Sequence, residues 1–446
     1  MSQNTPQSAR PARFSSGLGA WFTMVGVSVG LGNVWRFPYM MGQNGGSAFL
    51  LVYLACVLLL AVPALTAEWT LGRSTRQGPM GAFTQLWGSR WGLLAGSLLL
   101  VTVLVADAYY IVVISQIALS AGFSVSLGFN ESHWGQYQAL IGSSWWQFGV
   151  SALILLASLG VIALGVRRGI ERVSRWFVPF FALIMVYLVL SSLRLDGAFG
   201  HLQSFLQPNF DAMSAGDYFA ALGQAFFSLG LGGTFFVIYG SYLPARQSLF
   251  KPALATALGD TSAAILAGLF IVPTTLVFGL DLGQGPGLIF DTLPRLFMHM
   301  PGGQWLGALF LVGLVTVAFL SNIAALAVAA AALSKNEAHD QSVRLRPRVF
   351  VIIALIELAL MALISYDNDW IGTFDLIFGS GMQVGGSLMA IVAVAWGFSR
   401  SHLAQQVFGS SGENRTREQL WQFWLRWVIP GILVTLLLGY VLSQLT

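Results

Sequence analysis

Three polar side chains in an otherwise apolar chain could together bind a cation. Asn33 and Ser228 each lie next to a run of glycines, and Asp260 lies in a third apolar segment. Sodium is a hard cation that prefers oxygen ligands, as calcium and magnesium do. An amide, a hydroxyl, a carboxylate and free backbone carbonyls supply such ligands, and the carboxylate would offset the buried positive charge. The alternative for Asp260 is a helix-capping or packing role.

The glycines near Asn33 interrupt the first apolar segment. Residues 26–38 read GVSVGLGNVWRFP where a membrane helix should run unbroken. Glycine lowers the cost of leaving helical geometry, and unwound backbone at membrane depth is tolerated only where it faces protein or a water-filled cavity. We therefore expect a broken helix whose freed carbonyls and amides form a binding site. Close helix packing through Gly26 and Gly30 is the alternative.

A second glycine-rich stretch, FSLGLGGT at residues 227–234, interrupts the apolar segment that comes five helices later. Because five is an odd number, this segment enters the membrane from the opposite side. Glycine-interrupted helices at matching positions of two inverted halves are typical of the midplane site of secondary transporters. The pair therefore predicts a transport site, with coincidental glycine clustering as the alternative.

The composition is that of a polytopic membrane protein. Of the 446 residues, 56% are hydrophobic and only 9% are charged, whereas soluble proteins average about 25% charged residues. The net charge of +4 comes from basic residues in short loops and does not indicate a nucleic-acid partner. A single cysteine, Cys56, excludes a disulfide framework and a cysteine zinc site.

Spanning a bilayer takes about 20 mainly apolar residues. The segments that qualify number eleven: 15–40, 46–71, 92–124, 148–166, 174–194, 216–243, 252–281, 303–334, 349–366, 371–398 and 420–443. With the N-terminus in the cytoplasm, every lysine and arginine except Arg36, Arg194 and Arg295 falls on the cytoplasmic side or at its membrane edge, as the positive-inside rule requires. The polar residues 1–14 then form a cytoplasmic tail rather than a signal peptide. We expect a multi-pass protein of the plasma (bacterial inner) membrane with its C-terminus outside.

Other ionisable groups inside the membrane are costly and need a role or a partner. Glu68, at the end of the second segment, could accept hydrogen bonds from amides freed by unwinding, which is a structural role. Asp107 lies three residues before Tyr110, and Glu357 has no evident function. The chain has no P-loop, metal-spaced histidine pair or nucleophile elbow. It is therefore not expected to be an enzyme, and an ion gradient would have to drive transport.

These motifs resemble the neurotransmitter:sodium symporter family. The resemblance rests on residues 30–38 (GLGNVWRFP), 44–49 (NGGSAF), Glu68-Trp69, Gly72-Arg73, 224–229 (QAFFSL) and 239–242 (YGSY). It implies an all-α, five-plus-five inverted-repeat fold with broken helices 1 and 6 and an eleventh helix. The implied division is a tail (1–14), a first repeat (15–194), a second repeat (195–398), and a cytoplasmic loop with the last helix (399–446).

The resemblance also implies two sodium sites. The first would consist of the Ser28 carbonyl, Asn33, Ser228 and Asp260, completed by the substrate carboxylate. The second would consist of the Gly26, Val29 and Ala318 carbonyls with side chains from Ser321 and Asn322. The family usually has two hydroxyl residues at the last two positions, so Asn322 departs from the pattern, and a shift of one residue in helix 8 is the alternative.

The implied substrate pocket holds an amino acid at the helix breaks. Its residues would be Val27, Leu31, Gly32, Ala106, Tyr110, Phe227, Ser228, Gly230, Gly233, Asn322 and Leu326. Monoamine carriers have an aspartate at the position of Gly30, so glycine there favours an amino acid. Small residues in the lining favour a bulky apolar or aromatic substrate. Asp107 either borders the pocket, where it could meet a cationic group, or is a paired structural carboxylate.

Gates and anion dependence follow from the same resemblance. Phe227 and Tyr110 would form an inner lid over the substrate, and Arg36 with Asp375 an outer ion-pair gate. At the cytoplasmic end Tyr242 is kept, Arg10 or Arg13 and Phe14 replace the usual arginine and tryptophan, and Asn336 beside Glu337 replaces an aspartate.

Of the residues that hold chloride in dependent relatives, Tyr53, Gln224 and Ser228 are kept, but Ala264 stands in place of a serine. We therefore expect chloride independence.

The implied activity is sodium-coupled amino-acid uptake by alternating access. The sodium ions are co-transported, and no organic cofactor is expected. The expected partners are an amino acid, as a small-molecule ligand, and membrane lipid, without nucleic acid or an obligate protein partner. A carrier of another amino-acid-like solute or osmolyte, and a non-transporting sensor on the same fold, are the alternatives.

Overall fold

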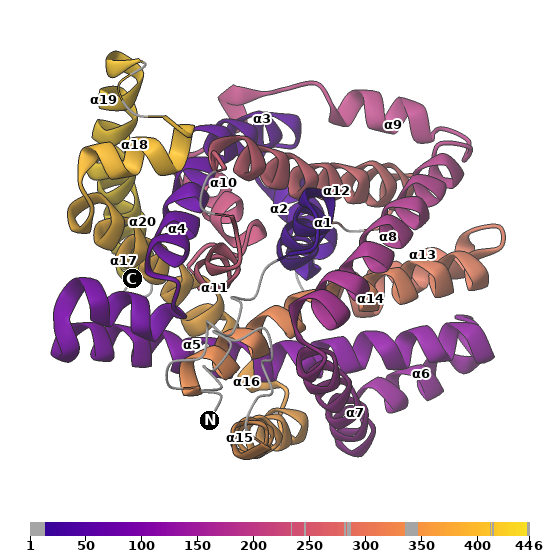
Figure 1. The fold of residues 1–446 in the computed structure, drawn as a ribbon. Coiled ribbons are helices and arrows are strands. Elements are labelled where there is room, and N and C mark those ends of the chain that lie inside the picture. Colours follow the sequence, from indigo (N-terminus) through magenta and orange to yellow (C-terminus); the bar gives the residue numbers. More distant parts are fainter. Residues whose placement is uncertain are drawn as a thin grey trace.

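The computed structural model describes residues 14–232, 234–244, 247–280, 282, 287–334, 347–410, 412 and 414–443. These residues form helices joined by short loops, with no strand among them (Figure 1). Within this described part, nine helices are long and apolar enough to cross a membrane. One further pair of helices, bent by 59°, passes the same test together. The predicted span 216–243 consists of two shorter helices separated by a break, so each predicted span contains helix.

The first half of the chain contains the first five spans. Its elements are α1 (Gly17–Ser28), η1 (Gly32–Arg36), α2 (Phe37–Gln43), α3 (Ser47–Cys56), η2 (Val57–Ala61), α4 (Val62–Thr75), α5 (Pro79–Ser126), η3 (Glu131–His133), α6 (Trp134–Ile141), α7 (Ser144–Ala163), η4 (Val166–Ile170) and α8 (Glu171–Ser192). Helix α5 starts before the predicted third span, and its first residues fold back on that span, so that Met80 lies against Gly96 and Thr84 against Gly92. Gly88, with φ of 79°, kinks α5 near its beginning.

The second half contains the remaining spans. Its elements are α9 (Ala198–Phe205), η5 (Phe210–Ala212), α10 (Ala215–Ser228), α11 (Phe235–Ser241), α12 (Phe250–Val277), η6 (Leu288–Thr292), α13 (Leu293–His299), α14 (Gly303–Leu333), α15 (Pro347–Tyr366), α16 (Asp369–Phe374), η7 (Asp375–Gly381), α17 (Met382–Gly397), α18 (Arg400–Phe408), α19 (Arg415–Phe423), η8 (Trp424–Val428) and α20 (Ile429–Ser443). The division into two repeats at residue 194 stays a prediction.

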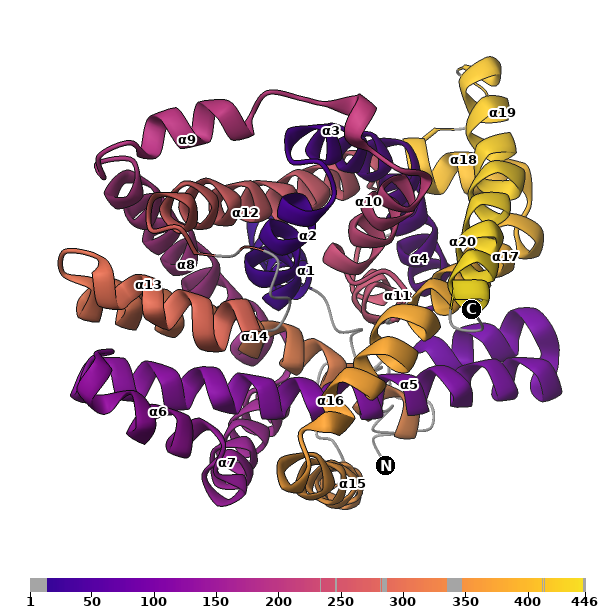
Figure 2. The ribbon, with the colours of Figure 1, turned by 180° about the vertical axis from the view of Figure 1, so that it is seen from behind.

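Four helices form a packed scaffold beside the first span. Helix α5 packs along α14, and both contact α7 and α15, so these four helices make one scaffold. Helix α1 lies in the middle of the molecule and contacts α8, α12 and α14 (Figure 1). Seen from behind, α2 and α10 lie side by side (Figure 2). The two broken helices therefore face each other and the scaffold.

Candidate functional site

The first helix break lies between α1 and η1, at Val29–Leu31. The chain bends by 59° here, and the freed amide of Gly30 donates to Asn33 Oδ1 at 2.9 Å. A Cβ on Gly30 would lie only 2.8 Å from the Tyr110 hydroxyl. Glycine is therefore required here for the close approach of Tyr110, whose hydroxyl accepts from the Leu31 amide at 3.4 Å. The predicted unwinding of helix 1 is present.

The second break separates α10 from α11. Gly230 and Gly232 have φ of 67° and 84°, a backbone conformation that residues other than glycine rarely adopt. The Gly232 amide donates to Glu68 Oε1 at 2.7 Å, and Glu68 is fully buried. Glu68 thus accepts a hydrogen bond from an unwound amide, as its structural assignment predicts. Gly233 lies outside the described residues.

Asn33, Ser228 and Asp260 meet in one buried cluster. Asn33 Nδ2 donates to Asp260 Oδ1 at 2.8 Å, to the Asp260 carbonyl at 3.1 Å and to Ser228 Oγ at 3.0 Å. Ser228 Oγ donates to Asp260 Oδ2 at 2.8 Å. Three elements, η1, α10 and α12, thus bring the side chains predicted for the first sodium site within hydrogen-bonding distance. The cluster holds a carboxylate and a hydroxyl, oxygen types that suit a hard cation, while the Asn33 amide oxygen accepts from Gly30.

A cavity of about 360 Å³ adjoins this cluster. Most residues predicted for the substrate pocket line it: Val27, Leu31, Gly32, Ala106, Tyr110, Phe227, Ser228 and Gly230. Ser28 and Ser321, predicted as sodium ligands, line it too. Ser228 belongs to both the cluster and the cavity wall, so a ligand in the cavity can contact the same hydroxyl as a cation in the cluster.

The wall also contains residues that the motifs did not single out. Trp35, Tyr109, Gln116, Phe290, Asn368 and Gln383 line the cavity. Tyr109 and Gln116 are seven residues apart on α5, so helical periodicity could have placed them on one face. Phe290 and Asn368 come from short elements between spans, for which the sequence carries no comparable signal.

Two predictions for α14 need correction. Ser321 Oγ donates to the carbonyls of Val27 and Val29, each at 3.2 Å, so Ser321 meets the first break. Asn322 instead donates to Asp107 inside the scaffold, and neither Asn322 nor Leu326 is in the cavity wall. Asn322 points about 100° further round α14 than Ser321, and this rotation turns it from α1 toward α5.

The same face of α14 presents an apolar residue next to Ser321. A Cβ on Gly26 would lie 2.7 Å from Leu320 Cδ1. Leu320 therefore lies against the part of α1 whose carbonyls were predicted for the second sodium site. Of the two side-chain ligands predicted there, only Ser321 reaches helix 1, while Val29, Gly26 and Ala318 could contribute backbone carbonyls alone.

Comparisons with known proteins identify the family. Residues 12–137 and 137–445 match the family model described as "Sodium:neurotransmitter symporter family". The chain belongs to this family.

Its relatives span bacteria, archaea and animals. The chain is 29% identical over 443 residues to the sodium-dependent transporter YhdH of Bacillus subtilis, covering 97% of this chain and 98% of that one. It is 31% identical over 324 residues to the sodium-dependent transporter MJ1319 of Methanocaldococcus jannaschii, covering 68% and 65%. The crystal structure of MhsT in complex with L-phenylalanine superposes with a TM-score of 0.83 and 29% identity, covering 96% and 99%. The fold of this symporter is therefore that of MhsT.

Two charged residues of this symporter were predicted to close the outer end of the site. The Arg36 guanidinium lies over the Phe227 ring, 4.0 Å from its centre, and Asp375 accepts a hydrogen bond from the Tyr109 hydroxyl at 3.0 Å. Arg36 and Asp375, both among the described residues, do not form an ion pair with each other, unlike Arg175–Glu171 and Arg295–Asp291. The predicted outer gate is thus unpaired, although Asp375 lines the cavity.

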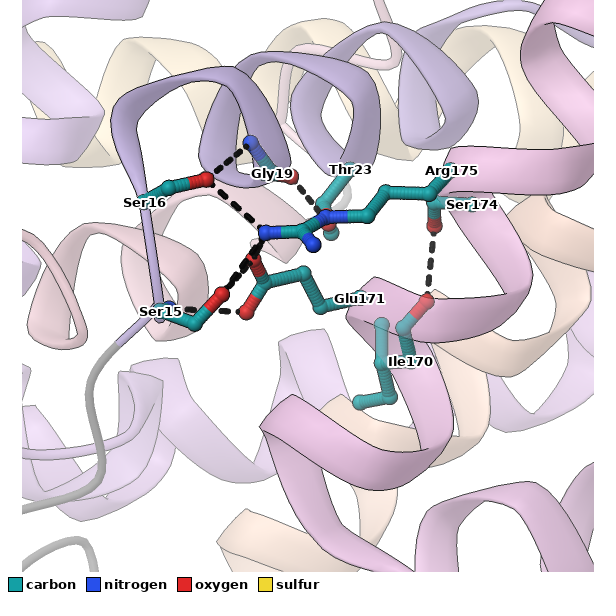
Figure 3. A network of polar contacts seen from close by, with 8 residues as sticks. All are labelled: Ser15, Ser16, Gly19, Thr23, Ile170, Glu171, Ser174 and Arg175. Carbon is teal, nitrogen blue, oxygen red and sulfur yellow. Dashed lines mark hydrogen bonds and ion pairs between the residues drawn. The ribbon is translucent and has the colours of Figure 1, made fainter.

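At the other end of the symporter, the start of α1 is tied to α8 (Figure 3). Glu171 accepts from the Ser15 amide at 2.8 Å and from the Ser15 hydroxyl at 2.6 Å. Arg175 donates to Glu171 at 2.6 Å and to the hydroxyls of Ser15 and Ser16 at 2.7 and 2.8 Å. No sequence motif pointed to this network, because serines near a terminus are common.

Aromatic rings pack beside this network. Phe14 stacks on Tyr239 and contacts the edge of Tyr242, which agrees with a closed end near the predicted gate residue Tyr242. The other predicted residues of this gate, Arg10, Arg13, Asn336 and Glu337, lie outside the described residues.

Proposed function

We propose that this protein is a sodium-coupled symporter that imports an amino acid with a bulky apolar or aromatic side chain. The observation that carries the proposal is the shared position of Ser228. Its hydroxyl belongs to the Asn33–Asp260 cluster and also lines the cavity. A carboxylate bound in the cavity can therefore complete the shell of a sodium ion bound at the cluster.

This shared shell explains coupling. A ligand that completes the other's coordination raises the other's affinity, and the effect is reciprocal by thermodynamic linkage. The hydroxyl of Tyr110 and the amide of Leu31, which lie together at the break, are suited to hold the amino-acid carboxylate. Residues Ser28, Asn33, Ser228 and Asp260 would hold the sodium ion.

The cavity wall supports a bulky apolar or aromatic substrate. Val103, Val113, Phe227 and Ile289 supply apolar surface, and Ala106 and Ala325 leave space. MhsT, whose fold this chain shares, was crystallised with L-phenylalanine. Apolar cavities with few convergent polar groups are typical small-molecule sites.

The transport cycle would be alternating access between two sides of the membrane. In the present structure the cavity reaches Asp375, while the network around Glu171 holds the opposite end. We infer an arrangement open toward the Asp375 side, which is the outside if the N-terminus is cytoplasmic and the C-terminus external. Helices α1, α4, α10 and α12 would move relative to the scaffold of α5, α7, α14 and α15.

We also propose that transport does not need chloride. The Asp260 carboxylate supplies a fixed negative charge next to the cation ligands, and Ala264, which is buried, offers no hydroxyl to a halide. The carboxylate makes a bound anion unnecessary for charge balance, and the missing hydroxyl removes a ligand for one.

The deciding experiment is uptake of a labelled amino-acid panel into proteoliposomes, with an inward sodium gradient or potassium in its place. Sodium-dependent accumulation of a bulky apolar or aromatic amino acid is the expected result, and Asp260→Ala should lower it at the same sodium concentration. If no amino acid accumulates but a labelled osmolyte added to the panel does, the substrate is another amino-acid-like solute. Sodium-dependent binding of an amino acid without any flux would favour a sensor.

A further inference from the structure

A buried carboxylate in the cavity wall has no part in the sodium cluster. Asp107 lies on α5, is 3% exposed and lines the cavity. Its Oδ1 accepts a hydrogen bond from Asn322 Nδ2 at 2.9 Å. Its Oδ2 has no hydrogen-bond partner among the described residues. A buried acceptor without a donor is unfavourable, so the free oxygen calls for a donor from a ligand.

A chain of hydrogen bonds fixes the orientation of this carboxylate. Ser158 on α7 donates to Asn322 Oδ1 on α14, and Asn322 donates in turn to Asp107 on α5. All three side chains are buried. Because both ends of the Asn322 amide are engaged, its NH₂ group is directed at Asp107 and one carboxylate oxygen is held ready as an acceptor.

A second buried carboxyl group lies near Asp107 on the scaffold side. Glu357 on α15 lies within electrostatic reach of Asp107, and neither of its oxygens has a hydrogen-bond partner among the described residues. Glu357 does not line the cavity. Because Glu357 makes no hydrogen bond to Asp107 among the described residues, a donor to Oδ2 has to come from the cavity that Asp107 lines.

The position of Asp107 matches the side chain of an amino acid held at the break. Asp107 precedes Tyr110 by three residues, about one helical turn along α5. A substrate whose carboxylate meets Tyr110 and Leu31 therefore has its side chain within reach of Asp107. Val103, Ala106 and Ala325 in the same wall leave room for a ring.

We propose that Asp107 is a specificity-determining residue that accepts a hydrogen bond from an N–H or O–H group on the ring of an aromatic amino acid. The inference rests on the proposed function and narrows its substrate class to amino acids such as tryptophan and tyrosine. Phenylalanine lacks the donor and leaves the buried oxygen unpaired. Sites built to hydrogen-bond a substrate group discriminate strongly against analogues that lack it.

The test measures sodium-driven uptake of tryptophan, tyrosine, phenylalanine and 1-methyltryptophan by the wild-type protein in proteoliposomes. The last compound keeps the indole ring but replaces its N–H. We expect kcat/KM for tryptophan or tyrosine to exceed that for phenylalanine by about tenfold or more. 1-Methyltryptophan should fall to the level of phenylalanine. This comparison needs no variant, so it does not depend on the folding of a mutant.

Two variants then assign the effect to one residue. Asp107→Leu should reduce the preference for tryptophan over phenylalanine to within about twofold while phenylalanine uptake persists. Ser115→Ala is the matched control, because Ser115 is a buried polar residue on the same helix outside the cavity wall, and it should keep the preference. Both proteins are checked for monodispersity and thermal stability.

The outcomes separate the inference from the function on which it rests. Equal uptake of phenylalanine, tryptophan and 1-methyltryptophan would overturn the inference, as would a preference that survives Asp107→Leu or preferred uptake of lysine. The absence of sodium-driven uptake of every amino acid would overturn the proposed function itself.

Discussion

The guanidinium of Arg36 lies 4.0 Å from the centre of the Phe227 ring, so the two predicted gates are in contact with each other. Asp375, the expected partner of Arg36, accepts a hydrogen bond from Tyr109 instead. A cation over an aromatic face is stabilised by the ring quadrupole. This stacking keeps the outer ion pair apart until the arginine moves.

The first prediction concerns this outer gate. Arg36→Ala and Asp375→Asn should each lower sodium-driven uptake by about tenfold, because closing the gate joins two charges in a desolvated site. Sodium-dependent substrate binding should change less than uptake. Arg295→Ala is the matched control, since its pair with Asp291 is partly exposed and such pairs contribute little. Equal losses in all three variants would contradict a gating role.

The second prediction concerns the cation cluster. Asp260→Ala removes the carboxylate that accepts from both Asn33 and Ser228. The sodium concentration for half-maximal uptake should rise by about tenfold or more, and substrate affinity should fall with it because the ligands are linked. Asp291→Ala, a partly exposed carboxylate, is the control. Unchanged sodium dependence in Asp260→Ala would remove Asp260 from the site.

The third prediction concerns chloride. Initial uptake by the wild-type protein should not change when gluconate replaces chloride, because Asp260 already supplies the negative charge. The double variant Asp260→Asn with Ala264→Ser removes that charge and adds a hydroxyl, and its uptake should become chloride-stimulated. Chloride stimulation of the wild-type protein would refute this assignment.

The fourth prediction separates two sources of strain at the second break. Gly230 and Gly232 both have positive φ, so alanine is disfavoured at each by about 1–2 kcal/mol. A Cβ at Gly232 would also collide with the carbonyl of Gln383, whereas at Gly230 the nearest atom, on Phe235, is 3.4 Å away. Gly232→Ala should therefore lower the thermal unfolding midpoint far more than Gly230→Ala, as measured in detergent. Equal midpoints would show that α17 shifts to make room.

The fifth prediction concerns the network of Ser15, Glu171 and Arg175. Glu171→Gln weakens the charge-assisted bonds that hold the start of α1 against α8. A cysteine introduced as Thr23→Cys, in a background with Cys56→Ser, should then react faster with a membrane-impermeant thiol reagent applied from the Ser15 side. Thr23 is fully buried here. Arg417 is a basic residue on α19 that takes no part in this network, so the control variant Arg417→Gln should leave the reaction rate unchanged.

The sequence predicted the parts of the site that depend on backbone breaks and on charge in an apolar chain. Glycines near Asn33 and Ser228 marked both breaks, and the cost of buried charge singled out Glu68 and Asp260, all of which the structure places at the breaks. These signals lie within short stretches of sequence, so they can be recognised without the structure.

Features that depend on helix rotation could not be obtained in the same way. Asn322 and Ser321 are adjacent in sequence, but a rotation of about 100° sends one into the scaffold and the other to α1. The bond from Asn322 to Asp107 crosses between two helices, and no spacing within either helix encodes it. The network at Glu171 was missed for the same reason, since its hydrogen bonds between the start of α1 and α8 join residues 156 to 160 apart in the sequence.

The orientation of Asn33 bears on how quickly such a carrier can turn over. Its amide hydrogens point at Asp260 and Ser228, and its oxygen accepts from Gly30. The protein's own atoms thus satisfy the buried carboxylate, which lowers the barrier for an unloaded carrier to travel back across the bilayer. An arriving ion must displace these amide hydrogens. Under the proposed function, this displacement would weaken sodium binding and speed its release where sodium is scarce.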